Sequence, residues 1–146
     1  MSKNVLLLQG GLSAERAVSF ASGKPVQNAL ESSGYRVVTF DPDWDVAQTL
    51  PLALQGIDVV FNALHGKWGE DGNIQGILIF AKVPYTHSGV LASSLAMDKP
   101  LSKTVFAASG IPTVADVSVT LADLTQGDPL PRPSVTTPAQ AGSSLR

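Results

Sequence analysis

The residues best suited to chemistry lie in the segment ALHGKWGEDGNIQG, residues 63–76. His65 is one of two histidines in the chain, and it stands among four glycines and the acids Glu70 and Asp71. A neutral imidazole beside a carboxylate can orient it or pass a proton, and glycines let the backbone approach a ligand closely. The segment therefore predicts a ligand-binding loop. The alternatives are that His65 only satisfies backbone groups of the loop, and that the acids are solvated or cap the next helix.

A second candidate is the segment GGLSAER, residues 10–16. It lacks the third glycine of a dinucleotide fingerprint and the Gly-Lys-Ser/Thr of a phosphate loop. A helix that begins here would offer free N–H groups to an anion, whereas Glu15 would favour a cation such as an amino group. Such a loop can hold a zwitterion, for example a free amino acid. The alternative is that Ser13 only caps the helix and that Glu15 only complements its dipole.

The remaining candidates are weaker. Lys99 and Lys103 would share one face of a helix and could meet phosphates, or could form a solvated surface. The run of residues 142–144, Gly-Ser-Ser, could wrap a phosphate with its N–H groups, or could have no function. Trp68 could cover a ligand or attach the loop to the domain. No histidine–carboxylate cluster has the spacing of zinc ligands, so we predict no metal site.

Three apolar runs that read as strands, residues 4–8, 35–40 and 58–62, alternate with helical patterns at residues 14–32, 46–54 and 74–82. This alternation implies an open parallel sheet with right-handed crossovers and flanking helices, an α/β fold. Parallel strands end at one edge of a sheet, so Glu15 and His65 should face the same crevice there. We expect Pro25 to end or kink the first helix and Gly34 to stop it. Asp71 or Asn73 should cap the third helix.

Further along, residues 83–86 read as a short, edge-type segment. Helices are expected at about residues 90–97 and 101–109, followed by an extended segment at 111–120. Beyond Leu124 the chain is rich in Pro, Ser and Thr and cannot build a core.

Composition narrows the class of protein. The chain has 146 residues, of which 44% are hydrophobic and 15% charged, so we expect a globular protein of about one domain. A net charge of −2 without a basic run argues against a nucleic-acid partner. No cysteine is present, so disulfides and thiolate metal sites are excluded. We see no signal peptide and no apolar run near the ~20 residues of a membrane helix, and therefore expect a cytoplasmic protein without a membrane partner.

Taken together, four segments resemble the N-terminal part of D-alanine–D-alanine ligase, an ATP-grasp enzyme of peptidoglycan precursor synthesis. They occur in the order and at the spacing of that family. The segments are GGLSAERAVSFASG (10–23), ALHGKWGEDGNIQG (63–76), PYTHSGVLASSLAMDKPLSK (84–103) and GIPT (110–113).

The resemblance implies a reaction in which ATP, with Mg²⁺, phosphorylates the carboxylate of one D-alanine and the amine of a second attacks the acyl phosphate. It implies that Glu15 holds the ammonium of the first D-alanine with His65 beside it, in a pocket that includes Gly11 and Ser13. Lys99 would contact ATP, and Ser143 would be the serine of a glycine-serine loop that links with the glutamate. It also implies a homodimer formed through the N-terminal domain.

The C-terminal segment departs from the family. In PSVTTPAQAGSSLR, residues 133–146, Thr137 stands where the family has a phosphate-contacting lysine and Ala141 where it has an acid. We divide the chain into a substrate-binding domain, residues 1–97, and the start of an incomplete ATP-grasp domain, residues 98–146. With most of the ATP site missing, we expect that this chain alone does not ligate. The alternatives are a catalytically inactive α/β module that binds an amino acid or another subunit, and a folding-defective fragment with apolar surface exposed at residues 101–108.

Overall fold

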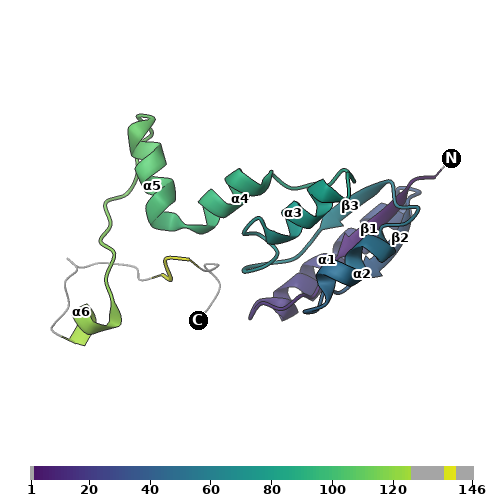
Figure 1. The fold of residues 1–146 in the computed structure, drawn as a ribbon, viewed down its shortest axis with the longest axis horizontal. Coiled ribbons are helices and arrows are strands. Elements are labelled where there is room, and N and C mark those ends of the chain that lie inside the picture. Colours follow the sequence, from purple (N-terminus) through teal and green to yellow (C-terminus); the bar gives the residue numbers. More distant parts are fainter. Residues whose placement is uncertain (1, 126–136, 141–146) are drawn as a thin grey trace.

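The computed structural model describes residues 2–125 and 137–140, and within them it shows an α/β fold with helices on both sides of a parallel sheet (Figure 1). The class and the order of the first six elements agree with the sequence prediction. The elements are β1 (Asn4–Leu8), α1 (Arg16–Ser32), β2 (Arg36–Phe40), α2 (Val46–Ala53), β3 (Val59–Asn62), α3 (Asn73–Phe80), α4 (Val90–Met97), α5 (Lys99–Ala108) and α6 (Leu121–Thr125).

The sheet has the order β2-β1-β3, and both pairings are parallel, as the alternation predicted. Leu6 of the central strand lies opposite Val38 of β2 and Val60 of β3. Beyond β3 the chain adds one parallel bridge, between Val60 and Tyr85. The segment 83–86 is therefore an edge segment of this sheet, as predicted.

The core lies on one face of the sheet, under α2 and α3. Side chains alternate along a strand, so Leu6 and Leu8 point to this face, while Leu7 points to the face on which α1 lies. Burying each leucine contributes roughly 2 kcal/mol, which makes this cluster the main attachment of α2 and α3. Its fully packed members are Leu6, Leu8, Leu50, Leu54, Val60, Leu64, Ile74 and Leu78.

Helix α1 differs from its prediction at two points. It begins at Arg16 rather than residue 14, because the Ser13 hydroxyl accepts the N–H of Glu15 (3.1 Å) and forms a turn before the first helical residue. Of the two effects expected of Pro25, the ending of the helix does not occur, because α1 continues to Ser32. A proline removes one bond to the carbonyl four residues earlier. The neighbouring bonds and the packing of α1 on β1 and β2 outweigh that loss.

Three helices end in the same way, with one residue in the left-handed conformation. At the end of α1, Gly34 (φ 86°) and the next residue donate to Glu31 and Leu30, a Schellman motif. Gly110 (φ 71°) has the same position after α5. After α3 the position is occupied by Lys82 (φ 56°), although a residue with a Cβ is strained there.

The starts of α3 and α5 were predicted less accurately. Gly72 (φ 96°) is the N-cap of α3, and Asp71 accepts the N–H of Asn73 (3.2 Å), so Asp71 is the capping acid and Asn73 is helical. Helix α5 begins at Lys99, before the expected residue 101, because the Asp98 carboxylate caps it by accepting the N–H of Leu101 (3.0 Å). Residues 111–120, predicted as an extended segment, contain neither helix nor strand, and α6 was not predicted.

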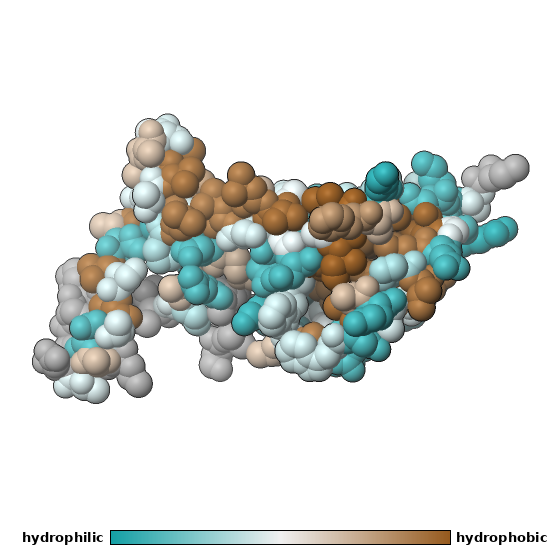
Figure 2. All heavy atoms as spheres, viewed as in Figure 1, coloured by the Kyte–Doolittle hydropathy of each residue, from teal (hydrophilic) through white to brown (hydrophobic). Residues whose placement is uncertain are grey.

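Apolar side chains are exposed along α3, α4 and α5, where Figure 2 shows a continuous brown band. Phe80 and Leu91 are 91% and 82% exposed. Leu101, Val105 and Phe106 on α5 are also exposed, so the apolar surface expected at residues 101–108 is present. No helix in the described ranges is long and apolar enough to cross a bilayer.

Candidate functional site

The site is built at the edge of the sheet where the three strands end. Gly10 and Gly11 follow β1, Asp41 follows β2, and His65 and Gly66 come shortly after β3. This is the edge at which open α/β sheets bind ligands. The two segments that the sequence singled out therefore meet here.

Ser19, one turn into α1, ties the ends of β1 and β3 together. Its side chain is fully buried, and its hydroxyl accepts the N–H of Gly10 (2.8 Å) and donates to the carbonyl of Ala63 (2.7 Å). One side chain thus satisfies a backbone group at the end of each strand, and so sets the distance between the two loops.

Glu15 and Ser13 lie directly against the loop that follows β3. The Ser13 hydroxyl donates to the carbonyl of His65 (2.6 Å). Glu15 is only 6% exposed, and a Cβ at Gly66 would lie 2.2 Å from its Oε2. The carboxylate therefore packs on the Cα of Gly66, which has a left-handed backbone (φ 71°). The start of α1 and the loop that contains His65 therefore lie directly against each other.

The ring of His65 lies between α1 and the carboxylate of Glu70. Its Nε2 is 3.0 Å from the Ser22 hydroxyl, and its Nδ1 is 4.0 Å from Oε1 of Glu70. The other oxygen of Glu70 accepts the N–H of Gly66 (2.5 Å). Glu70 thus lies where it can orient the imidazole.

The rest of the loop is fixed by buried amides. The carbonyl of Gly69 accepts from Nδ2 of Asn62 and from Nε2 of Gln75, both at 2.9 Å, and both side chains are buried. A Cβ at Gly69 would lie 2.4 Å from the Cβ of Leu64, so only glycine fits. The loop is therefore held in one conformation before any ligand arrives.

Asp41 fixes the segment after β1 from the side of β2. Its carboxylate accepts the N–H of Gly11 (2.9 Å). It also pairs with the two terminal guanidinium nitrogens of Arg16, Nη1 and Nη2. Arg16 also donates to the carbonyl of Gly11 (3.0 Å). The hydrogen bonds from Arg16, and then that from Gly11, hold the pKa of Asp41 below its usual value. Both backbone groups of Gly11 are thus bonded to charged side chains.

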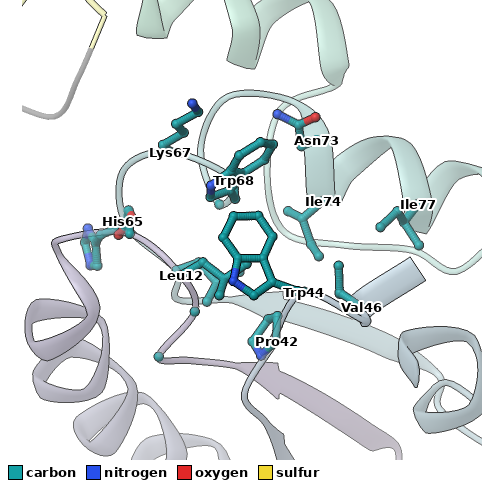
Figure 3. Close-up of a pocket in the computed structure, with 15 residues that line it drawn as sticks. Leu12, Pro42, Trp44, Val46, His65, Lys67, Trp68, Asn73, Ile74 and Ile77 are labelled. Carbon is teal, nitrogen blue, oxygen red and sulfur yellow. The ribbon is translucent and has the colours of Figure 1, made fainter. Parts of the chain in front are cut away.

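A cavity of about 290 Å³ lies beside this assembly, on the side of α2 and α3 (Figure 3). The indole rings of Trp44 and Trp68 meet edge to face in it, with centroids 5.9 Å apart and planes at 74°. Glu15 is not among its lining residues, and Figure 3 shows His65 apart from the two indoles. The lining residues are Gly10, Gly11, Leu12, Ser13, Pro42, Trp44, Val46, Leu64, His65, Lys67, Trp68, Gly69, Asn73, Ile74 and Ile77.

The structure does not bring every predicted site residue to this edge. Lys99 begins α5, lines neither of the cavities at the strand ends, and donates to the carbonyl of Pro138 (2.9 Å). Lys103 pairs with Asp116 (3.0 Å) instead of facing a phosphate site. Ser143 lies outside the described residues. Within residues 2–125 and 137–140, no cluster of three or more His, Asp or Glu side chains could hold a metal ion.

Sequence reasoning missed Ser19, Ser22 and Asp41. Residues 15, 19 and 22 lie at successive turns of one helix face, and a polar stripe at this spacing, starting from Glu15, would have indicated the two serines. Asp41 directly follows a predicted strand, as His65 nearly does, and that position was the available signal.

Comparison with known proteins gives a consistent result. The family model described as "D-ala D-ala ligase N-terminus" matches residues 45–88. The chain is 48% identical, over 143 residues, to the D-alanine–D-alanine ligase of Granulibacter bethesdensis, covering 98% of this chain and 47% of that protein. It is 52% identical to the ligase of Azorhizobium caulinodans over 145 residues, again covering 47% of the relative.

Solved structures agree with the sequence matches. A D-alanine–D-alanine ligase from Bacillus anthracis superposes with a TM-score of 0.75 at 30% identity, over 97% of this chain and 47% of that one. The ligase from the same organism complexed with ATP gives a TM-score of 0.70 at 30% identity, over 86% and 43% of the two chains. The chain spans about half the length of the curated relatives it matches.

Proposed function

We propose that this chain, whose sequence and fold match the N-terminal portion of D-alanine–D-alanine ligases, supplies the pocket for the first D-alanine of an ATP-dependent ligase. The observation that carries this proposal is the buried carboxylate of Glu15. It lies against Gly66 at the shared end of the strands, next to the loop that contains His65.

The charges at this position suit the ammonium of an amino acid. Glu15 is buried at the start of α1, and its carboxylate packs against Gly66. A charge-assisted bond to an ammonium in such a partly desolvated place is stronger than one in water. His65, fixed by Ser22 and near Glu70, lies on the same loop as Gly66 and borders this place.

Binding of D-alanine to the wild-type chain, followed by calorimetry or by amide chemical shifts, tests the proposal. We expect Glu15→Gln to weaken binding by about ten-fold or more, since a hydrogen bond to a charged group contributes roughly 1.5–3 kcal/mol. Glu31→Gln is the matched control, because Glu31 is exposed on the same helix and its side chain bonds only to Gln27 among the described contacts. Equal D-alanine affinity in wild type and Glu15→Gln would refute the assignment.

ATP enters through a relative that was solved with ATP, and Mg²⁺ enters only through the family resemblance. Lys99 is the described residue proposed to contact ATP, and it lies on α5 with its ammonium on a backbone carbonyl. The described residues offer no carboxylate cluster for Mg²⁺.

It follows that the 146-residue chain on its own should bind D-alanine without joining two of them. The test is an assay of ADP release with D-alanine, ATP and Mg²⁺, beside a full-length ligase. Turnover close to that of the full-length enzyme would contradict this expectation. Binding without turnover also separates an amino-acid-binding domain from a folding-defective fragment. Such a fragment would neither bind D-alanine nor release ADP.

Three further assignments remain predictions. They are the division into residues 1–97 and 98–146, the homodimer formed through the N-terminal domain, and the cytoplasmic location. The role of Ser143 in linking a glycine-serine loop with Glu15 is likewise a prediction. Sedimentation of the purified chain at several concentrations would test the dimer.

A further inference from the structure

The cavity under Trp44 and Trp68 does not include Glu15, the residue that carries the proposed D-alanine pocket. These are the only two tryptophans in the chain, and both line it. Trp44 is 74% exposed although its ring edge meets Trp68. A large indole that remains this exposed at the mouth of a cavity offers apolar surface to a ligand.

The backbone at Trp68 indicates that its position is imposed by the fold. Trp68 has φ 73°, a left-handed conformation that residues with a Cβ rarely adopt. Its N–H donates to Oδ2 of Asp71 (2.9 Å), and the next residue, Gly69, is pressed against Leu64. Such strain persists only where the surrounding structure determines it, and it concentrates at ligand clamps.

The size and polarity of the cavity do not suit D-alanine. At about 290 Å³ it lies near the lower limit of small-molecule pockets. Its walls away from the glycine loop are apolar, formed by Leu12, Val46, Ile74 and Ile77. An amino acid whose apolar part is one methyl group would leave most of this surface uncovered, whereas a ring would cover more of it.

One cation lies at the edge of the cavity. The Nζ of Lys67 is 4.7 Å from the centroid of the Trp68 ring, and Lys67 lines the cavity. Among the residues that the structure describes, the ion pairs leave Lys67 without a carboxylate. An anionic group on the ligand would provide that partner.

We propose that this cavity is a second ligand site that takes a small aromatic monocarboxylate, with its ring against Trp44 and Trp68 and its carboxylate at Lys67. The site shares the wall formed by Gly11, Ser13 and His65 with the D-alanine pocket, but Glu15 is not part of it. It does not depend on the assignment of D-alanine.

The tryptophans report on their own site. We expect phenylacetate to change their fluorescence in a saturable way, with a dissociation constant on the order of 1–10 mM for a ligand of this size. Neutral phenylacetamide should bind about ten-fold more weakly because it lacks the charge for Lys67. Hexanoate should also bind more weakly because it lacks the ring. No saturable change up to about 20 mM phenylacetate, or equal binding of all three compounds, would overturn the proposal.

Variants separate this site from its neighbour. Lys67→Gln should weaken phenylacetate about ten-fold and leave phenylacetamide unchanged, and Lys24→Gln, at an exposed lysine beside Gln27, is the matched control. Trp44→Ala should weaken both compounds, with Trp68 as the remaining reporter. Glu15→Gln should retain phenylacetate binding. Loss of that binding in Glu15→Gln, or wild-type affinity in Lys67→Gln and Trp44→Ala, would refute a separate site.

Discussion

Replacing Ser19 by alanine tests how the site is held together. The substitution removes one hydroxyl that is fully buried and that bonds the N–H of Gly10 and the carbonyl of Ala63. Each buried backbone group left without a partner costs roughly 1–3 kcal/mol, so the free energy of unfolding should fall by about 2–6 kcal/mol. This is a large part of the roughly 5–15 kcal/mol that stabilises a typical domain. D-alanine affinity should fall as well, because the loops after β1 and β3 lose their common attachment.

Urea unfolding followed by tryptophan fluorescence and by far-ultraviolet circular dichroism gives the change in free energy directly. Ser32→Ala is the matched control, because Ser32 is exposed on the same helix, and it should change stability by less than about 0.5 kcal/mol. If Ser19→Ala also changes stability by less than about 0.5 kcal/mol, the two buried bonds do not have the importance assigned to them.

The other predictions concern backbone strain and charge. Lys82→Gly should raise the free energy of unfolding by about 1 kcal/mol, because glycine relieves the left-handed conformation at φ 56°; a loss of stability in urea unfolding would contradict this. Gly66→Ala should lower D-alanine affinity at least about ten-fold, since its Cβ would displace the carboxylate of Glu15, and a titration within two-fold of wild type would exclude that contact. The pKa of Asp41 is lowered in the folded state, so its stabilising contribution is present above its unfolded pKa and is lost as the pH falls through the folded value. Asp41→Asn should therefore be less stable than wild type at about pH 6, and the difference should shrink below about pH 4; a difference that stays constant with pH would refute the role of the Arg16–Asp41 pair.

The regular elements were predictable because their signals are local. Short apolar runs gave the three strands, and their alternation with helical patterns gave the parallel sheet. The errors occurred where tertiary contacts override local preference. Pro25 lies inside a helix that packs on the sheet, and Lys82 occupies a left-handed position that a local rule assigns to glycine.

Within the site, the sequence by itself indicated Glu15 and His65 and the sheet edge at which they meet. The type of a residue and its position after a strand are enough to predict this meeting, because the carboxyl ends of parallel strands lie at one edge of the sheet. It also gave the resemblance to the ligases, through four segments spread along the chain.

Only the tertiary structure decided how these residues are held. The bonds of Ser19 to the ends of β1 and β3, the contact of Glu15 with Gly66, and the meeting of Trp44 with Trp68 each join segments far apart in the chain. Such contacts depend on the register and packing of the whole sheet, and no local pattern encodes them. The sequence therefore determined which groups could act, and the fold determined which of them meet and what space lies between them.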